Sequence, residues 1–245
     1  IRAPNNGGFA YGNNIVVRLA MKARPRPDYV LLLNPDTLVR EGAFRSILEF
    51  MASHPKVGIA GGRCEDPDTT PQVCSFRFPS PVGEFSSYLR LGLFDRLVRR
   101  WITDTDQPKE PGPVDWVAGA FMIVRTEVFD AVGLMDEGYF LYFEETDFIL
   151  RARRANWPCW HVPHSRVVHL VGQTTGVTAK HERPRRLPGF WFESRRRYFV
   201  LNYGRAYAIA ADLCALLACA LWRLRVLIER KPNDDTPTDA EPTVI

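Results

Sequence analysis

The sequence predicts an α/β protein in which a mixed, mostly parallel sheet is flanked by helices. Two observations carry this prediction. Short apolar runs of strand length, such as residues 28–34 and 56–62, alternate with segments of helical length and periodicity. The 245 residues are 46% hydrophobic and 24% charged, which is typical of a globular protein and excludes fibrous and disorder-dominated classes.

The first third of the chain supplies the clearest elements. Gly7 and Gly8 predict a loop, and residues 9–23 predict a helix that is entered through a turn near Asn13. Residues 28–34 form a nearly continuous apolar run, which is typical of a strand buried on both faces of a parallel sheet. A second helix is predicted over residues 41–53, and the strand over 56–62 follows it.

The middle of the chain departs from this alternation. Residues 65–113 are polar and rich in proline, with a basic helical piece over 89–101, so we expect an excursion from the sheet. Residues 114–125 predict a strand, and Thr126 is expected to be the N-cap of a short helix. Residues 159–170 predict the last strand.

An acidic block lies between these last two strands. The aromatic run at residues 140–143 is interpreted as strand-like, and the segment that follows it predicts a helix with arginines near its end. Asp147 and Arg151 are spaced for an i,i+4 ion pair. Glu144 and Glu145 are adjacent and must face different directions, so we expect at least one of them to point into a cleft.

The cysteines and the charge limit the class of protein further. Five cysteines without a CxxC pair favour neither a zinc ribbon nor a disulfide scaffold, and a reducing cytosol is the simpler expectation. The net charge of +4 is mild, but residues 180–205 hold eight Lys or Arg against two Glu. Because this basic segment directly precedes an apolar one, it suggests a membrane surface and not nucleic acid.

The apolar segment covers residues 206–222 and contains one acid, Asp212. As a helix it would be roughly 26 Å long, which is slightly shorter than a helix of the about 20 residues that are needed to cross a bilayer. We therefore favour an interfacial or re-entrant helix over a true span, and a plain core helix is the alternative. The polar end of the chain is expected to be disordered. We therefore predict three regions. A sheet domain covers residues 1–175, a membrane-associated helical region covers 176–230, and a disordered tail covers 231–245.

Two residues at predicted strand ends are candidate metal ligands. Asp36 closes the tripeptide Asn-Pro-Asp after a buried strand, where open α/β sheets bind their ligands. A carboxylate there can hold a divalent cation against a diphosphate, although the tripeptide is also a common turn. His169 ends the last predicted strand, and taken alone it is an ordinary core or surface histidine.

The order of these segments resembles the inverting family-2 glycosyltransferases of the GT-A fold. Within that family the chain is most similar to the bacterial rhamnosyltransferases that build cell-envelope polysaccharide, and residues 190–204 resemble the tail of that subgroup. The pieces that carry the resemblance are GGFAYGNN at 7–14, LLLNPD at 31–36, DWVAGAFMIVR at 115–125, GLMDEGYFLYFEETDFILRARRANW at 133–157 and VPHSRVVH at 162–169.

The resemblance implies a role for individual residues. Asp36 matches the last acid of the family's metal-binding DxD motif, with Asn34 in place of the first acid. Glu145 matches the catalytic base, and His169 matches a histidine that completes the metal site. The residues expected to contact donor or acceptor are Gly8, Asn14, Asn34, Trp116, Gly119, Ala120 and Glu144. We also hypothesise that Glu144 raises the pKa of Glu145 by like-charge repulsion.

The implied reaction moves a sugar, such as rhamnose or a related hexose, from a dTDP- or UDP-sugar. The acceptor is expected to be lipid-linked or a polysaccharide, and the cofactor a divalent Mg or Mn ion. The enzyme is expected at the cytoplasmic face of the membrane, peripheral or anchored by its C-terminal region, with no nucleic-acid partner. The alternatives are a nucleotidyltransferase, and a non-catalytic membrane-associated scaffold with a degenerate site.

The resemblance also bears on where the chain begins. The family starts with a strand, a helix and a strand that hold the nucleotide, whereas Ile1 leads directly into a later segment. We expect an N-terminal truncation of roughly 60 residues, and we expect the fragment alone to be inactive and poorly stable because its sheet edge is uncovered.

Overall fold

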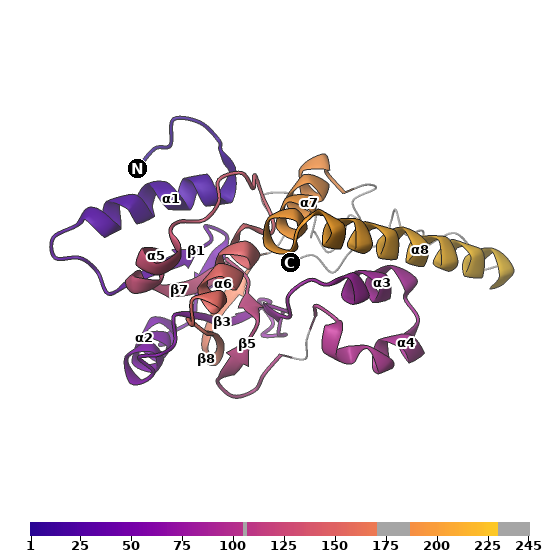
Figure 1. Ribbon diagram of the computed structural model, residues 1–245. Coiled ribbons are helices and arrows are strands. Elements are labelled where there is room, and N and C mark those ends of the chain that lie inside the picture. Colours follow the sequence, from indigo (N-terminus) through magenta and orange to yellow (C-terminus); the bar gives the residue numbers. More distant parts are fainter. Residues whose placement is uncertain (105–106, 171–186, 230–245) are drawn as a thin grey trace. The chain divides into compact units, whose positions relative to one another are not determined.

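The computed structural model describes residues 1–104, 107–170 and 187–229, which divide into two compact units. Of the described residues, 1–76 and 107–170 form the first unit, and 77–104 and 187–229 form the second (Figure 1). The predicted tail at 231–245 and the predicted boundary at 175 lie outside the described residues. The predicted division into regions therefore stays a prediction.

The first unit contains a sheet and its flanking helices. The predicted helices over 9–23 and 41–53 are confirmed as α1 and α2, and the predicted strands over 56–62 and 159–170 are confirmed as β3 and β8. The bounds are α1 Gly8–Lys22, β1 Tyr29–Leu33, β2 Thr37–Val39, α2 Ala43–Ser53, β3 Ile59–Glu65, β4 Ser75–Phe76, β5 Gly112–Val114, β6 Trp116–Val117, β7 Phe121–Arg125, α5 Thr126–Val132, α6 Glu144–Arg154 and β8 Cys159–His169.

The main sheet is mixed, and most of its pairings are antiparallel. The strand order is β1-β7-β3-β8-β2, with β5 added beside β8. Of these five pairings only β3 with β8 is parallel. The prediction of a mostly parallel sheet is therefore wrong, because an apolar run indicates burial and carries no information on strand direction. Direction is set by the connections, and β7 returns antiparallel between β1 and β3 after the long excursion.

Strand β1 differs from its prediction in the same way. It pairs with β7 alone among the described residues, in an antiparallel register that places Leu33 opposite Phe121. Leu32 is its one fully buried residue, and Leu33 is exposed. The prediction that this strand is buried on both faces of a parallel sheet is therefore wrong for the structure described.

Helices cover both faces of the sheet (Figure 1). On one face α2 contributes Ile47, Phe50 and Met51 to a buried cluster with Ala60 of β3 and Ile123 of β7. On the other face α1, α5 and α6 pack together. The ring stack of Phe129 on Phe148, with centroids 5.3 Å apart, joins α5 to α6. This layering holds the ends of β1 and β8 in place, where the candidate site lies.

The aromatic run at residues 140–143 is not a strand, which corrects its prediction. It is a bend that leads into α6, and both Tyr142 and Phe143 have positive φ, at 69° and 68°. This left-handed backbone is uncommon for residues other than glycine. It turns the chain abruptly, so that α6 begins with its acidic residues inside the protein instead of at its surface.

Thr126 also differs from its prediction. It is the first residue of α5, and its predecessor Arg125 occupies the N-cap without a side-chain cap. The Thr126 hydroxyl donates to the backbone carbonyls of Pro27 and Asp28, at 3.0 and 3.2 Å. These bonds fix the start of α5 to the segment that precedes β1.

The second unit is helical, and its elements include the basic piece predicted over 89–101. The buried Arg195 forms ion pairs with Glu84, at 3.1 Å, and with the half-exposed Asp212, at 2.5 Å. No helix within the described ranges is both long and apolar enough to cross a membrane. The bounds are α3 Pro81–Leu89, α4 Gly92–Leu97, the 3-10 helix Arg99–Trp101, α7 Gly189–Tyr203 and α8 Arg205–Glu229.

Candidate active site

The Asn-Pro-Asp tripeptide forms a tight turn directly after β1. The Asn34 carbonyl accepts hydrogen bonds from the backbone N–H and the hydroxyl of Thr37, at 3.3 and 2.7 Å. The Asn34 N–H donates to the Ala120 carbonyl at 2.9 Å. The turn is thereby attached to the loop between β6 and β7, which also carries Gly119.

Asp36 and His169 lie side by side at this end of the sheet. Thr37 pairs with His169 across β2 and β8, and the His169 Nε2 atom is 3.5 Å from Oδ1 of Asp36. The backbone carbonyl of Asp36 accepts a hydrogen bond from Leu170 at 2.9 Å. The structure therefore brings together the two residues predicted as metal ligands.

The chemistry of this pair fits a divalent cation. Oδ1 of Asp36 is buried and has no hydrogen-bond partner among the described residues, so a lone pair is available to a ligand. Burial lowers the pKa of His169 although Asp36 opposes the shift, and the neutral imidazole that results is the form that binds metals. Within the described ranges no group of three or more candidate ligands occurs.

Glu145 lies at the first turn of α6 and is almost completely buried, with 9% of its surface exposed. Its Oε1 atom accepts a hydrogen bond from the Gly119 N–H at 3.4 Å, and Oε2 has no partner among the described residues. Burial raises the pKa of Glu145, while the N–H groups of Glu145, Gly119 and Thr146 oppose this shift. One oxygen is thus anchored and the other is available to a proton donor.

Gly119 is constrained by close neighbours. A Cβ atom at this position would lie 2.8 Å from the ring of Phe9 and 3.5 Å from Oε1 of Glu145. Phe9 in turn donates its backbone N–H to the carbonyl of Phe140 at 3.1 Å. Sequence reasoning assigned no role to Phe9, because its contact with Gly119 joins segments more than 100 residues apart and leaves no local signal.

Glu144 is also buried, and its pKa is raised well above the usual range, first by burial and then by the charge of Glu145. The repulsion therefore acts mainly on Glu144, and not on Glu145 as hypothesised from the sequence. Backbone N–H groups from two separate segments favour the ionised form of Glu145. We therefore assign the negative charge of the pair to Glu145 and the proton to Glu144.

Glu144→Gln should raise the melting temperature at pH 7 by about 2–4 °C. A group whose folded pKa is raised contributes its full stability below its unfolded pKa and loses that contribution as the pH rises. Glutamine cannot ionise, so the variant does not lose this stability as the pH rises. At pH values below the ordinary 4.5 the carboxyl is protonated in both states, so the difference should vanish there. Thermal unfolding at both pH values checks this, and an equal gain at both would contradict the assignment of the proton.

Asp147 and Arg151 form the ion pair expected from their spacing, at 2.8 Å. Arg151 also donates to the backbone carbonyls of Val132 and Leu134, at 2.6 and 2.9 Å. The confirmed pair thereby holds α6 against the end of α5. Asp147 is a structural residue of this acidic block.

Gly8 and Asn14 contact the segment that precedes α6. Gly8 has a φ of 88° and lies so close to the backbone of Phe140 that a Cβ atom would collide with it. The Asn14 amide donates to the carbonyl of Met135 and to Glu137, both at 2.9 Å. These contacts brace the site from α1, and the predicted binding roles of both residues stay predictions.

Trp116 and Ala120 are almost fully enclosed. Trp116 is 0% exposed and its ring stacks on Phe76, with centroids 4.4 Å apart. Ala120 is 4% exposed and contributes its carbonyl to Asn34. Both residues shape the loop that carries Gly119, and their predicted contact with donor or acceptor stays a prediction.

Comparison with known proteins identifies what the chain is similar to. Residues 2–188 match the model of the family described as glycosyltransferase like family 2. The chain is 32% identical over 152 residues to an N-acetylglucosaminyl-diphospho-decaprenol L-rhamnosyltransferase of Mycobacterium tuberculosis, covering 61% of this chain and 49% of the relative. It is 31% identical over 174 residues to the rhamnosyltransferase WbbL of Escherichia coli, covering 67% of this chain and 61% of that one.

The chain spans about half the length of the mycobacterial relative that it matches. A solved structure of GalNAc-T7 with UDP, GalNAc and Mn2+ aligns with a TM-score of 0.47 at 16% identity. That alignment covers 69% of this chain and 31% of the other.

Proposed function

Since this chain belongs to glycosyltransferase family 2, we propose that it is the catalytic part of an inverting enzyme that transfers rhamnose or a related hexose. The donor is a dTDP- or UDP-sugar, and the acceptor is a lipid-linked saccharide or a polysaccharide of the cell envelope. The relatives named rhamnosyltransferase, from Mycobacterium tuberculosis and Escherichia coli, support the choice of sugar.

One observation carries the proposal. Glu145 is hydrogen-bonded to Gly119, and the next residue, Ala120, is hydrogen-bonded to Asn34 at the head of the Asn-Pro-Asp turn. A buried carboxylate with one free oxygen and a strand-end acid paired with a histidine therefore belong to one connected backbone framework. Displacing a diphosphate from a sugar requires a base and a charged leaving-group site in fixed relation.

The chain's own residues account for the proton transfer. Oε2 of Glu145 accepts the proton of the acceptor hydroxyl while the hydroxyl oxygen of the acceptor bonds to the anomeric carbon. The bond from the anomeric carbon to the diphosphate oxygen breaks, and its electron pair leaves with the nucleoside diphosphate. Gly119 holds Oε1, which fixes the direction of the carboxylate. Because one base acts in a single displacement, the configuration at the anomeric carbon inverts.

Asp36 and His169 are the residues that would hold a divalent Mg or Mn ion. When bound, such an ion supplies positive charge that stabilises the departing diphosphate. The buried Oδ1 of Asp36, which lies 3.5 Å from Nε2 of His169, and the neutral imidazole of His169 support this assignment for the described part of the chain. Asn34 contributes its backbone to the turn, so the acid missing from the first position of the motif is not needed to form it.

The test of this function is transfer of labelled sugar from dTDP-rhamnose and UDP-hexoses to a lipid-linked acceptor, measured with the natural protein that contains this chain. Transfer of the glycosyl group with release of nucleoside diphosphate is expected. Transfer of the nucleotide itself would support a nucleotidyltransferase instead. Donor binding without any transfer would favour a non-catalytic scaffold.

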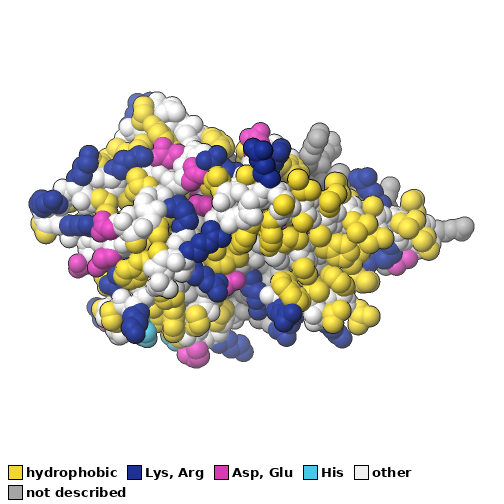
Figure 2. Space-filling model, in the orientation of Figure 1, with side chains coloured by type: hydrophobic (Ala, Val, Ile, Leu, Met, Phe, Trp, Pro, Cys, Tyr) yellow, Lys and Arg dark blue, Asp and Glu magenta, His cyan; other side chains and the backbone are white. Residues whose placement is uncertain are grey.

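We further propose that α8 rests on the cytoplasmic face of the membrane. Ala208, Ala211 and Ala218 are buried, whereas many large apolar side chains of the same helix are exposed. Arginines flank this segment at 205, 223 and 225, as expected beside anionic lipid. Figure 2 shows hydrophobic side chains gathered along α8. The α8 apolar face consists of Ile209, Leu213, Leu216, Leu217, Leu221, Leu224, Leu227 and Ile228.

Replacing Leu213 and Leu217 with Gln should lower binding to anionic vesicles by at least about tenfold, since each buried leucine contributes roughly 1.5–3 kcal/mol. The matched control replaces Leu19 and Leu48, which are similarly exposed in the first unit. Vesicle co-sedimentation measures both. If the two double variants co-sediment with vesicles to the same extent, α8 is not the membrane contact.

A further inference from the structure

A cavity of about 500 Å³ opens in the first unit, beside β8 and β3. Its size lies within the roughly 300–1,000 Å³ usual for small-ligand sites. Its position on the sheet differs from that of the Asp36–His169 pair. The lining residues are Arg63, Pro71, Gln107, Pro108, Lys109, His161, Pro163, His164 and Arg166. We call this cavity the β8 pocket.

The charge of the β8 pocket is strongly positive. Arg63, Lys109 and Arg166 line it, and no acid does. Arg63 and Arg166 lie opposite each other in the β3–β8 register, so their side chains emerge from adjacent strands. Glu110 approaches His164 at 3.6 Å, but both side chains are largely exposed and belong to the rim.

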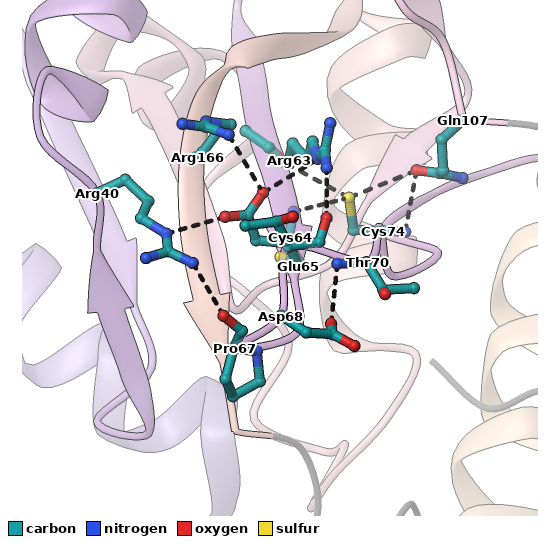
Figure 3. Close-up of polar contacts among 12 residues, drawn as sticks. Arg40, Arg63, Cys64, Glu65, Pro67, Asp68, Thr70, Cys74, Gln107 and Arg166 are labelled. Carbon is teal, nitrogen blue, oxygen red and sulfur yellow. Dashed lines mark hydrogen bonds and ion pairs between the residues drawn. The ribbon is translucent and has the colours of Figure 1, made fainter.

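One buried acid compensates only part of this charge. Glu65 is 0% exposed and lies 3.3 Å from Arg63, 3.7 Å from Arg166 and 2.9 Å from Arg40 (Figure 3). The three cations that line the pocket, Arg63, Lys109 and Arg166, thus outnumber this one carboxylate by two even without Arg40. Arg40 contacts Glu65 without lining the pocket, whereas the other two arginines do both.

His161 adds an unpaired polar atom to the wall. The residue is 1% exposed, and its Nδ1 atom is buried without a hydrogen-bond partner among the described residues. Burial, and then the charge of Arg63, lower the pKa of His161 to about 4, so the ring is neutral at pH 7. A neutral imidazole can present an N–H at Nδ1 to an oxygen acceptor. An orphaned buried nitrogen in a protein interior calls for a partner.

The wall opposite β8 is fixed in place by Gln107. Its Oε1 atom accepts a hydrogen bond from the backbone N–H of Cys74 at 3.1 Å (Figure 3). It accepts a second one from the backbone N–H of Ser75, also at 3.1 Å. Its amide donates to the Ser75 carbonyl at 3.2 Å. The pocket is therefore built before a ligand arrives, which reduces the entropy lost on binding.

The β8 pocket is distinct from the candidate active site. In the β3–β8 register His161 lies opposite Gly61, and Val168, which precedes His169, lies opposite Glu65; these positions are four residues apart on β3, or roughly 13 Å at about 3.3 Å per residue. Even Arg166, the nearest lining residue along β8, precedes His169 by three residues, or roughly 10 Å. Neither Asp36 nor His169 lines the pocket, so we treat it as a second anion site.

We propose that the β8 pocket binds a phosphate group, with Arg63, Arg166 and Lys109 supplying charge and His161 supplying a neutral donor. Guanidinium groups match the geometry of phosphate oxygens and favour phosphate over a spherical anion. The phosphate is either free in solution or the headgroup of a lipid. This inference does not depend on sugar transfer, because binding is measured without a donor or an acceptor.

The experiment is titration of the natural protein with inorganic phosphate, followed by calorimetry. Replacing both Lys109 and Arg166 with Gln should weaken phosphate binding by at least about tenfold, since each charged contact contributes to affinity. Arg40→Gln is the matched control. It also removes one arginine from Glu65, but it leaves the lining unchanged, and its phosphate affinity should stay within about twofold of the parent.

Two outcomes would overturn the proposal. One is that the parent protein does not bind inorganic phosphate; the other is that Arg40→Gln weakens binding as much as the double variant. Lys109→Gln alone, at an exposed residue, keeps the test valid should the double variant unfold. Phosphatidylcholine vesicles with and without phosphatidic acid distinguish the sources. If phosphatidic acid increases vesicle binding of the parent but not of the double variant, the ligand is a lipid headgroup. If phosphatidic acid changes vesicle binding of both proteins equally, the ligand is free phosphate.

Discussion

Glu145→Gln should lower the rate of sugar transfer by about 10²- to 10⁴-fold, the usual contribution of a general base. Glutamine has nearly the same shape and retains an oxygen that can accept the Gly119 hydrogen bond. It cannot take up a proton at pH 7. Because the base is not needed to hold the donor, donor affinity should stay close to that of the parent. Transfer at saturating donor and donor binding by calorimetry are measured side by side.

Glu127→Gln is the matched control, since Glu127 is an exposed acid in the first turn of another helix, α5. Its transfer rate should equal that of the parent. Burial raises the pKa of Glu145, so the acidic limb of the parent's kcat profile should lie above the ordinary value of 4.5. Activity falls as the pH drops through that limb, because the base becomes protonated. A Glu145→Gln enzyme that transfers at the parental rate would exclude Glu145 as the base.

Asp36→Asn should abolish high-affinity binding of a divalent cation and, with it, cation-dependent donor binding. The substitution keeps the size of the side chain but removes the negative charge, which is the main attraction for a hard cation. His169 alone would be left as a protein ligand among the described residues near this turn. Mn2+ binding is followed by electron paramagnetic resonance, and donor binding is measured with and without a chelator.

Asp130→Asn provides the control. Asp130 is a half-exposed acid of α5 that forms an ion pair with Arg26. Its Mn2+ affinity should be unchanged. His169→Ala should weaken Mn2+ binding less than Asp36→Asn does, since it removes a neutral ligand. Donor binding that is indifferent to the chelator would contradict the metal role of both residues.

The fold could be predicted where the signal is local. The helices α1 and α2 and the strands β3 and β8 follow from apolar periodicity within single segments. Strand direction could not be predicted, because it depends on how distant segments connect. Strand β7, for example, runs antiparallel to both of its neighbours. The bend before α6 was interpreted as strand because its aromatic residues favour strands, and positive φ at Tyr142 and Phe143 overrides that preference.

The candidate site shows the same division. Nε2 of His169 lies 3.5 Å from Oδ1 of Asp36, because Thr37, the residue after Asp36, pairs with His169 across β2 and β8. Their roles, and that of Glu145, stay predictions. The charge distribution within Glu144 and Glu145 could not be read from the sequence, since it depends on the Gly119 N–H from a different segment.

The β8 pocket escaped the sequence analysis for a related reason. Glu65 and Arg63 are only two residues apart, but Arg40 and Arg166 reach the same carboxylate from β2's end and from β8. Charged residues scattered over more than 100 positions show no pattern in one sequence. The pairings of β8 with β3 and with β2 bring them together.

The configuration of the product at its anomeric carbon tests the central claim most directly. A single ionised base, Glu145, next to a protonated Glu144 supports one displacement at that carbon and provides no second step. The proton NMR coupling and chemical shifts of the transferred sugar report its configuration relative to the donor. We predict an inverted product from the natural protein. A product with retained configuration would contradict the single-base mechanism and the assignment of Glu145.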